Sequence, residues 1–384
     1  MQYRKLGRTG IEVSEIALGC EGFSGMTAEE TKALLGYAFS HGMNFIDLYS
    51  SEPELRSHLG QAVHELGIRD CFYFEAHIGS AWENGQYKRT RDVEEAREAF
   101  QDLLTRLQTD YIDVGMIHYV DEQADFDTVF HGPFIDYVKN LKAAGKIKAI
   151  GMSSHNPLVA RQAVETGLID VLLFSINPAY DIQPPNEDVN ELWNDDNYET
   201  IDFTMDKDRE ALYELCEKEN VAITVMKCYG GGDLLDEKLS PFKVRLSPMQ
   251  CISYCLDRPG VKAVMLGIKT RAEADRAVAY ERAGKEERDY GGVLSGLPRS
   301  NIAGKCVYCG HCAPCTVGID IASVNKYTNL VKAQKEIPET VREHYALLAN
   351  HASECIQCGV CETNCPFGVS IIEKMDEAVK IFER

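Results

Sequence analysis

The sequence predicts an α/β fold: a (β/α)8 TIM barrel followed by a small, mainly α-helical domain. Three observations lead to this prediction. Short apolar strand patterns alternate eight times with helical patterns up to about Gly284. The strand patterns are almost continuously apolar, as expected for parallel strands buried on both faces. Beyond Gly284 the composition changes to a cysteine-rich tail.

The elements follow in a regular order. A hairpin is expected first, where "QYRKLGRTGIEVS" places two short strands around a glycine-bearing turn. The expected barrel strands are residues 16–20, 44–49, 71–78, 112–118, 147–154, 171–177, 221–227 and 263–268. The expected helices are residues 28–40, 53–66, 91–107, 133–144, 156–166, 207–219, 246–257 and 271–284. Thr27 and Glu30 have the spacing of a capping box at the first helix. Eight strand–helix units are the number in a TIM barrel.

Three connections are long, and each follows the carboxyl end of a strand, where such barrels carry their active sites. They are residues 79–90, 119–132 and 178–205. The stretch "KEERDYGGVLSGLPRSNIAG" has the composition of a connecting segment. We therefore expect a barrel over 1–290, a linker over 291–304 and a second domain over 305–384.

Charge and hydropathy exclude several classes of partner. The chain of 384 residues has a formal net charge of −20, and the segment from Leu297 onward holds nine Lys/Arg against ten Asp/Glu. The excess of acid therefore belongs to the predicted barrel, which argues against nucleic-acid and anionic-membrane partners. No run of 18 apolar residues and no signal-peptide pattern is present, so we expect a cytoplasmic protein.

Eight cysteines of the tail occur in two groups. Cys355, Cys358, Cys361 and Cys365 follow the pattern C-x2-C-x2-C-x3-C-P, which is typical of [4Fe–4S] proteins. The earlier group has a last gap of two residues and consists of Cys306, Cys309, Cys312 and Cys315. In the two-cluster pattern the fourth cysteine of each group binds the other cluster.

We therefore expect two [4Fe–4S] clusters in a ferredoxin-like iron–sulfur domain. One would be held by Cys306, Cys309, Cys312 and Cys365, the other by Cys355, Cys358, Cys361 and Cys315. Structural zinc is the alternative, although zinc sites usually separate their C-x2-C pairs. The other six cysteines are expected mostly in the core, with Cys228 placed just past a strand.

Polar side chains gather at the predicted barrel mouth. Asp47, Glu52, His77, His118 and His155 all lie at or just past the carboxyl ends of strands. Carboxylates and imidazoles together can exchange protons near neutral pH, because each shifts the pKa of the other. Alternatives remain open: His155 could cap a helix, Glu52 could be a solvated first-turn acid, and the histidines with a carboxylate could bind a metal.

Six segments resemble, in order, the landmarks of the aldo-keto reductases. They are "RKLGRTGIEVSEIALGC", "NFIDLYSSEPELRSHLG", "YIDVGMIH", "IGMSSHN", "MKCYGGGDLL" and "DRPGVKAVMLGIKT". The resemblance covers about residues 3–282, and the tail is similar to the helical ferredoxin domain of one subgroup of that family. It implies an NADP(H)-dependent oxidoreductase with a tetrad of Asp, Tyr, Lys and His.

Only half of that tetrad is found here. Asp47 and His118 match the Asp and the His, whereas Glu52 stands where the Tyr is expected and His77 where the Lys is expected. A Tyr needs a neighbouring Lys because its ordinary pKa is about 10, whereas His titrates near 6.5. We therefore expect Glu52 and His77 to do the proton transfer that Tyr and Lys do in the family.

The resemblance also implies cofactor contacts. The phosphate-loop glycines are matched by Gly230, Gly231 and Gly232, the carboxamide contacts by Ser153 and Ser154, and the 2′-phosphate site by Lys269 and Thr270. Ala277 and Leu173 replace an Asn and a Gln that usually contact the cofactor. If NADP(H) binds, we expect it to bind weakly.

Three functions remain open. The first is a redox enzyme in which the clusters pass electrons between a small carbonyl or hydroxyl compound in the barrel and an external carrier such as ferredoxin or flavodoxin. The second is a conventional NADP(H)-dependent carbonyl reductase with structural clusters. The third is an electron-transfer or scaffold protein whose barrel has lost catalysis. The replaced Tyr and Lys weigh against the second, the retained Asp47 and His118 against the third.

Overall fold

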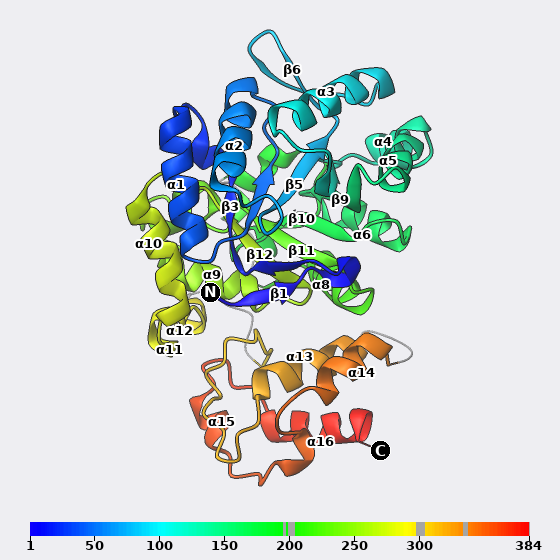
Figure 1. Cartoon of the computed structure of the whole chain (residues 1–384). Helices are drawn as coiled ribbons and strands as arrows, with labels where there is room; N and C mark the ends of the chain where they lie inside the picture. The colour runs from blue at the N-terminus through cyan, green and yellow to red at the C-terminus, as the bar shows by residue number, and fades with distance from the viewer. Residues whose placement is uncertain (195–196, 199–203, 297–303, 333–336, 384) are drawn as a thin grey trace.

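A computed structural model describes residues 1–194, 197–198, 204–296, 304–332 and 337–383. Its central feature is a closed barrel of eight parallel strands in the order β10-β11-β12-β3-β4-β5-β8-β9 (Figure 1). The strands are β3 (Ile16–Gly19), β4 (Phe45–Leu48), β5 (Tyr73–Ile78), β8 (Ile112–Ile117), β9 (Ile147–Ser154), β10 (Val171–Ser175), β11 (Ala222–Met226) and β12 (Val261–Leu266). The predicted barrel is confirmed.

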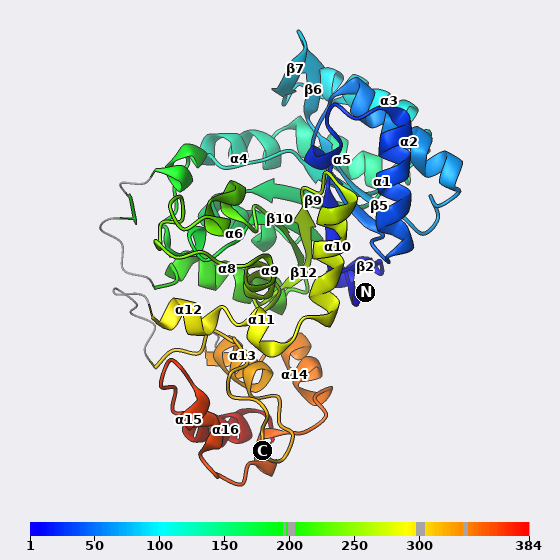
Figure 2. The ribbon, with the colours of Figure 1, turned by 90° about the vertical axis from the view of Figure 1, so that its left-hand side faces the viewer.

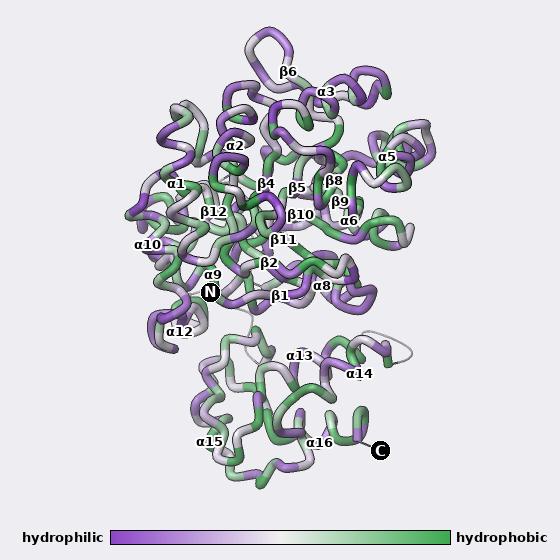
Figure 3. Tube along the Cα trace, viewed as in Figure 1, coloured by the Kyte–Doolittle hydropathy of each residue, from purple (hydrophilic) through white to green (hydrophobic). Residues whose placement is uncertain are grey.

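Helices surround the barrel. They are α1 (Ala28–Ser40), α2 (Pro53–Leu66), α3 (Val93–Arg106), α5 (Pro133–Ala143), α6 (Pro157–Glu165), α8 (Lys207–Lys218), α9 (Pro248–Leu256) and α10 (Arg271–Ala279). The capping box of Thr27 and Glu30 opens α1 as expected. The barrel strands are mostly hydrophobic in Figure 3, because one face packs inside the barrel and the other against the helices.

Hairpins lie at opposite ends of the barrel. The hairpin of β1 (Tyr3–Lys5) and β2 (Glu12–Ser14) lies at one end, and that of β6 (Ser80–Glu83) and β7 (Gln86–Arg89) projects from the other (Figures 1 and 2). The second hairpin occupies the predicted loop 79–90, and α4 (Gln123–Phe130) occupies the predicted loop 119–132. In the third long connection, residues 195–196 and 199–203 lie outside the described part of the chain.

The tail is helical, with a hydrophobic core of its own. Its helices are α13 (Ile321–Lys332), α14 (Glu339–Ala346), α15 (Val360–Asn364) and α16 (Ile371–Phe382). Two short helices, α11 (Lys285–Arg288) and α12 (Gly291–Ser295), precede it, and residues 297–303 of the predicted linker lie outside the described residues. Within the described residues, we find no helix with the length and apolar character needed to cross a membrane.

The tail packs beneath the barrel, on the side of β1 and away from the β6–β7 hairpin (Figures 1 and 2). The contacts are specific. Thr340 of α14 donates to the carbonyl of Lys218 at 2.7 Å, and His344 lies 2.8 Å from Glu217. The carbonyl of Val307 accepts from Arg258 and from Tyr290.

Candidate active site and cluster sites

Three buried side chains form a hydrogen-bonded line at the carboxyl ends of adjacent strands. Asp47 lies in β4, His77 in β5, and His118 directly follows β8. Nε2 of His77 lies 3.0 Å from Oδ1 of Asp47, and Nδ1 of His77 lies 2.7 Å from Nδ1 of His118. Because β4, β5 and β8 are neighbours in the barrel, the fold brings together three of the four predicted catalytic residues.

Tyr87 extends this line outward. It lies in β7, and its Oη is 2.9 Å from Nε2 of His118. Tyr87 was not among the predicted site residues, because residues 79–90 were expected to form a loop. A usable signal was present: Asn84 and Gly85 form the turn with φ of 53° and 78°, and Asn-Gly between short strands is a strong hairpin signal.

Burial favours the uncharged forms of His118 and Glu75 in this site. Burial first, and then the nearby His77, Arg91 and Arg89, lower the pKa of His118 well below its ordinary value. Glu75 is a register neighbour of Asp47 and is completely buried. Burial and the Asp47 charge raise the pKa of Glu75 well above its usual range, while Thr224 Oγ1 donates to its carboxyl at 3.1–3.2 Å. The surroundings therefore favour a neutral His118 and a protonated Glu75.

Glu52 lies beside this line rather than in it. It occupies the N-cap position of α2, is half-buried and accepts a hydrogen bond from Ser24 Oγ at 3.2 Å. Within the described residues its carboxyl makes no hydrogen bond to the Asp47–His77–His118 line.

His155 is held apart from the other two histidines. Its Nδ1 lies 2.9 Å from Oδ2 of Asp121, and its backbone amide donates to Oδ1 of the same carboxylate at 2.6 Å. The neighbouring Asn156, not His155, caps α6 through a hydrogen bond to Leu158 N. In the part of the chain that the structure describes, no three His, Cys, Asp or Glu side chains could hold a single metal ion.

The glycine loop and one serine have features that fit a nicotinamide dinucleotide. Gly230, Gly231 and Gly232 follow β11 with φ of 60°, 72° and 112°, a conformation that side chains rarely adopt. A Cβ on Gly231 or Gly232 would meet no atom within 4 Å, so the loop is open to a ligand. Among the residues that the structure describes, the buried hydroxyl of Ser153 has no hydrogen-bond partner, whereas Ser154 already donates to the carbonyl of Val120 at 2.7 Å.

The predicted 2′-phosphate site is already occupied by a side chain. The backbone amides of Lys269 and Thr270 donate to Oε2 of Glu273 at 2.7 and 3.1 Å, and Thr270 Oγ1 accepts from the Glu273 amide in a capping box. A phosphate would have to displace this carboxylate and would meet its negative charge. The residues at the 2′-phosphate position therefore fit NADP(H) poorly, whereas the glycine loop fits the phosphates of a dinucleotide.

The eight tail cysteines line two separate hollows. One is lined by Cys306, Cys309, Cys312 and Cys365, together with Phe367 and Val369. The other is lined by Cys315, Cys355, Cys358 and Cys361, together with Ile319 and Met375. All eight thiols are free of disulfides. Four thiols around an apolar hollow are a donor set that fits a [4Fe–4S] cluster.

Side chains also approach the sulfur atoms. Asn325 Nδ2 donates to Cys306 Sγ at 3.6 Å, and Thr316 Oγ1 lies 3.4 Å from Cys358 Sγ. His311 lies between Cys309, with Nδ1 3.3 Å from Sγ, and Asp289, with Nε2 2.7 Å from Oδ2. Such contacts to cluster sulfurs tune reduction potentials.

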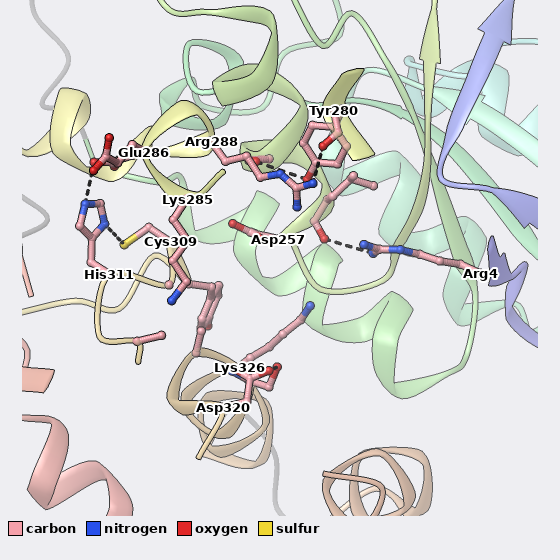
Figure 4. A pocket seen from close by; sticks show the side chains of 18 residues that line it. Arg4, Asp257, Tyr280, Lys285, Glu286, Arg288, Cys309, His311, Asp320 and Lys326 are labelled. Atoms are coloured by element: carbon pink, nitrogen blue, oxygen red, sulfur yellow. Dashed lines mark hydrogen bonds and ion pairs between the residues drawn. The ribbon is translucent and has the colours of Figure 1, made fainter. Parts of the chain in front are cut away.

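A pocket of about 540 Å³ lies where the barrel meets the tail. Figure 4 shows its lining side chains, which include Arg4 and Asp257 from the barrel and Cys309 and Lys326 from the tail. Burial lowers the pKa of Lys326 to about 8, against the opposing effect of Glu217. Its lining residues include members of β1, α9, α11 and α13, which lie on the opposite side of the barrel from the β6–β7 hairpin (Figure 1), so the pocket forms no part of the mouth.

Comparison with known proteins agrees with both parts of the structure. Residues 15–247 match the profile of the "Aldo/keto reductase family", and residues 302–369 match that of the "4Fe-4S dicluster domain". Aldo-keto reductase AKR11C1 from Bacillus halodurans in its holo form shares the fold, with a TM-score of 0.58 and 21% identity over 75% of this chain and 94% of that one.

Two curated relatives are more similar in sequence. Aldo-keto reductase YhdN of Bacillus subtilis is 29% identical over 195 residues, which is 48% of this chain and 54% of the relative. Protein tas of Escherichia coli is 27% identical over 180 residues, 40% of this chain and 52% of that protein. The chain thus spans about half the length of the curated relatives it matches. The family profile covers most of the chain, and the protein belongs to the aldo/keto reductase family, with a 4Fe–4S dicluster domain at its C-terminal end.

Proposed function

We propose that this protein is an oxidoreductase that converts a small carbonyl or hydroxyl compound in the barrel mouth. Two [4Fe–4S] clusters in the tail exchange electrons with an external carrier such as ferredoxin or flavodoxin. The observation that carries the proposal is the buried line of Asp47, His77 and His118 at the carboxyl end of the barrel. A reducing cytoplasm suits a chain whose fourteen cysteines are all free thiols.

The proton chemistry falls to residues that replace half of the family tetrad. Asp47 and His118 hold their family positions, and His77 links them in place of the usual Lys. His118 is neutral at neutral pH, so it can hydrogen-bond a substrate oxygen without adding a charge. Glu52 stands in the position of the family Tyr, and we keep it as a candidate proton donor at the start of α2.

The clusters would supply single-electron transfer. Each hollow of four thiols would hold one of them, with the fourth cysteine of each group crossing to the other hollow. This arrangement supports two-cluster binding by the predicted ligand sets.

A buried line of hydrogen bonds supports electronic contact between the tail and the mouth. The line begins at Val307, the residue after Cys306. Arg258 donates to the carbonyl of Val307 and also to the carbonyl of Tyr254. The Tyr254 hydroxyl in turn donates to Asp181 at 2.9 Å. Arg209 completes the line: its Nη1 donates to Oδ1 of Asp181 at 3.4 Å, and its Nη2 donates to the carbonyl of His155 at 3.5 Å. The line crosses the flank of the barrel through groups that exclude water.

A conventional reductase with structural clusters is the second candidate. The open glycine loop and the unpartnered Ser153 hydroxyl favour nicotinamide binding. When bound, a nicotinamide would supply or accept a hydride. The Glu273 carboxylate in the 2′-phosphate site weighs against tight NADP(H) binding.

One anaerobic experiment separates the hypotheses. The clusters are reduced with dithionite, excess reductant is removed, and diacetyl is added as a small dicarbonyl probe while the cluster spectrum is followed. We expect diacetyl to reoxidise the clusters in the wild type and much more slowly in His77→Gln; Glu52→Gln tests the retained donor. NADPH oxidation without cluster turnover would support the conventional reductase instead, and neither reaction would support a scaffold.

A further inference from the structure

We propose that Tyr87 exchanges a proton with the substrate, and that His118, His77 and Asp47 form a relay that stores that proton. The inference rests on the proposed redox reaction. It is carried by the three successive contacts of 2.9, 2.7 and 3.0 Å that join Tyr87 to Asp47. It assigns the proton exchange to a residue outside the family tetrad.

The polarity of the relay follows from its inner end. A carboxylate only accepts hydrogen bonds, so the contact with Asp47 places the proton of His77 on Nε2. Nδ1 of a neutral His77 is then an acceptor, and the proton of His118 must lie on Nδ1. Nε2 of His118 is left as an acceptor, and the Tyr87 hydroxyl donates to it. A neutral His118 agrees with its lowered pKa.

Tyr87 is the member of the relay that a substrate can reach. Its side chain is 38% exposed, whereas Asp47, His77 and His118 are 5%, 3% and 4% exposed. The Tyr87 hydroxyl also has a side-chain hydrogen bond with Tyr119. With its proton directed at His118, the Tyr87 oxygen keeps two lone pairs, so it can accept from Tyr119 and from a substrate hydroxyl. In the resting state Tyr87 is therefore arranged to take a proton from a substrate hydroxyl.

The hairpin that carries Tyr87 is anchored on both sides. Ser51 Oγ donates to the carbonyl of Ala81 at 2.6 Å, and Lys88 pairs with Glu95 at 2.8 Å. Arg89 lies over the ring of Tyr119, 4.5 Å from its centroid. These contacts fix β7 over the mouth, so the Tyr87–His118 contact does not rest on a free loop.

The charged and titratable groups around the relay are few. Arg89, Arg91, Tyr119 and His155 face Tyr87 or His118. Cys20, Tyr49 and Glu75 lie near Asp47. Burial and the Asp47 charge raise the pKa of Glu75 and favour its protonated form, which places no second negative charge beside Asp47.

The proton steps balance. In oxidation, the substrate O–H bond breaks and its proton bonds to the Tyr87 oxygen, while the phenol proton moves to Nε2 of His118. The Nδ1 proton of His118 moves to His77, and the Nε2 proton of His77 moves to Asp47. The net change in the relay is one proton on Asp47. In the proposed reaction the two electrons of the substrate C–H bond would be taken up by the oxidised clusters, one by each, and the proton of that bond would go to water. Reduction of a carbonyl reverses every step.

Nitrogen-15 NMR of histidine-labelled full-length protein tests the relay without turnover. We expect protons on Nε2 of His77 and Nδ1 of His118. Tyr87→Phe should shift the Nε2 signal of His118, because that nitrogen loses its hydrogen-bond donor. Tyr49→Phe, which removes another phenol from the same mouth, should leave the four signals in place. A proton found on Nε2 of His118 in the wild type would overturn the proposal.

Turnover supplies the second readout. The rate at which diacetyl reoxidises reduced clusters should fall at least about 100-fold in Tyr87→Phe, the lower end for loss of an acid–base group. It should stay within about twofold of wild type in Tyr49→Phe. If diacetyl does not reoxidise the clusters of the wild type, the proposed function is refuted, and the NMR result alone decides whether the relay exists. If the wild type is active and Tyr87→Phe is equally fast, the relay is refuted and the proposed function stands.

Discussion

Glu75 illustrates at the level of one residue how the barrel places a proton where solvent cannot reach. It is fully buried, and its described hydrogen-bond donor is Thr224. An ionised carboxylate there would be desolvated and would lie next to Asp47, so the folded protein favours the protonated form. In the unfolded chain the same carboxyl ionises near its ordinary pKa of about 4.3.

Glu75→Gln should therefore change how stability depends on pH. The folded pKa of Glu75 is raised, so its contribution is intact below pH ~4 and is lost as the pH rises. From pH 5.5 to 7.5 the unfolding free energy of Glu75→Gln, relative to wild type, should increase by about 1.4 kcal/mol per pH unit until the folded pKa is reached. Urea unfolding at each pH measures this slope.

Asp170→Asn is the matched control, because the pKa of Asp170 is shifted the other way. Burial opposes ionisation of Asp170, but Lys142, the amide of Ile150 and Arg8 together lower its pKa. Asp170 is therefore ionised in both the folded and the unfolded state from pH 5.5 to 7.5. The variant should be less stable by about 2 kcal/mol, the order expected when charge-assisted hydrogen bonds are lost, and without a pH slope. Equal slopes in the two variants would contradict the account of Glu75.

Glu273 gives a second prediction at this scale. Because its carboxylate fills the phosphate position, NADPH should bind no more tightly than NADH. Glu273→Gln removes the charge and should improve NADPH binding about tenfold relative to NADH, or ~1.4 kcal/mol. Asp275→Asn, on the same helix but bonded to Tyr37, should leave the ratio unchanged. Anaerobic calorimetry with NADPH and NADH measures this ratio of affinities. If the wild type binds NADPH tightly, the Glu273 carboxylate does not block the 2′-phosphate position.

The sequence allowed a site residue to be predicted where its place at the end of a barrel strand is enough to bring it near the others. Asp47, His77 and His118 end three neighbouring strands, so the barrel topology brings them together. Tyr87 reaches them through the geometry of a hairpin inserted after β5, which strand periodicity does not describe. Likewise, the sequence showed Lys269 and Thr270 but not that Glu273, one turn into α10, would bind their amides.

At the scale of elements, buried strands were the easiest to predict. Each observed barrel strand overlaps its predicted segment, because strands covered on both faces read as apolar runs. The β6–β7 hairpin is polar and half-exposed, with Trp82 and Tyr87 among its exposed side chains, so it lacks such a run.

Packing between α2 and α3 gives a prediction for this scale. A Cβ at Gly60 would overlap the carbonyl oxygen of Arg106 and the Cα of Leu107, which are backbone atoms and cannot rotate away. Gly60→Ala should therefore destabilise the barrel by about 2 kcal/mol or more, within the range for overpacking. Gly36→Ala is the control: its Cβ would lie 3.3 Å from the flexible Leu66 side chain. Thermal unfolding should show that variant neutral or stabilised by up to ~1 kcal/mol.

At the scale of the whole molecule, the β6–β7 hairpin over the mouth and the helices α13–α16 of the tail, which carries the two cysteine-lined hollows, lie on opposite sides of the barrel (Figures 1 and 2). In the proposed reaction, electrons would cross the flank formed by α8 and α9, where Arg258, Tyr254 and Asp181 form a buried line of hydrogen bonds. The sequence predicted both domains but not their relative placement, because the docking contacts join single residues far apart in the chain. Thr340 with Lys218 and Tyr290 with Val307 are examples.

The ligand sets of the clusters can be tested by pairing cysteine substitutions. If the fourth cysteines cross, Cys309 and Cys365 belong to one hollow, and Cys309 and Cys315 to different ones. The double variant Cys309→Ser/Cys365→Ser should then retain about four of eight irons per chain, whereas Cys309→Ser/Cys315→Ser should lose nearly all of them.

In-order ligation predicts the reverse result for the two double variants. Cys71→Ser, an exposed thiol of the barrel, controls for the substitution itself and should keep all eight irons. Iron and acid-labile sulfide are measured after anaerobic preparation, with electron paramagnetic resonance of the reduced protein to identify the cluster type. Zinc in place of iron would refute cluster binding altogether. Because both double variants remove two thiols from the same small domain, a difference in iron content between them reports which cysteines share a cluster rather than how well the domain folds.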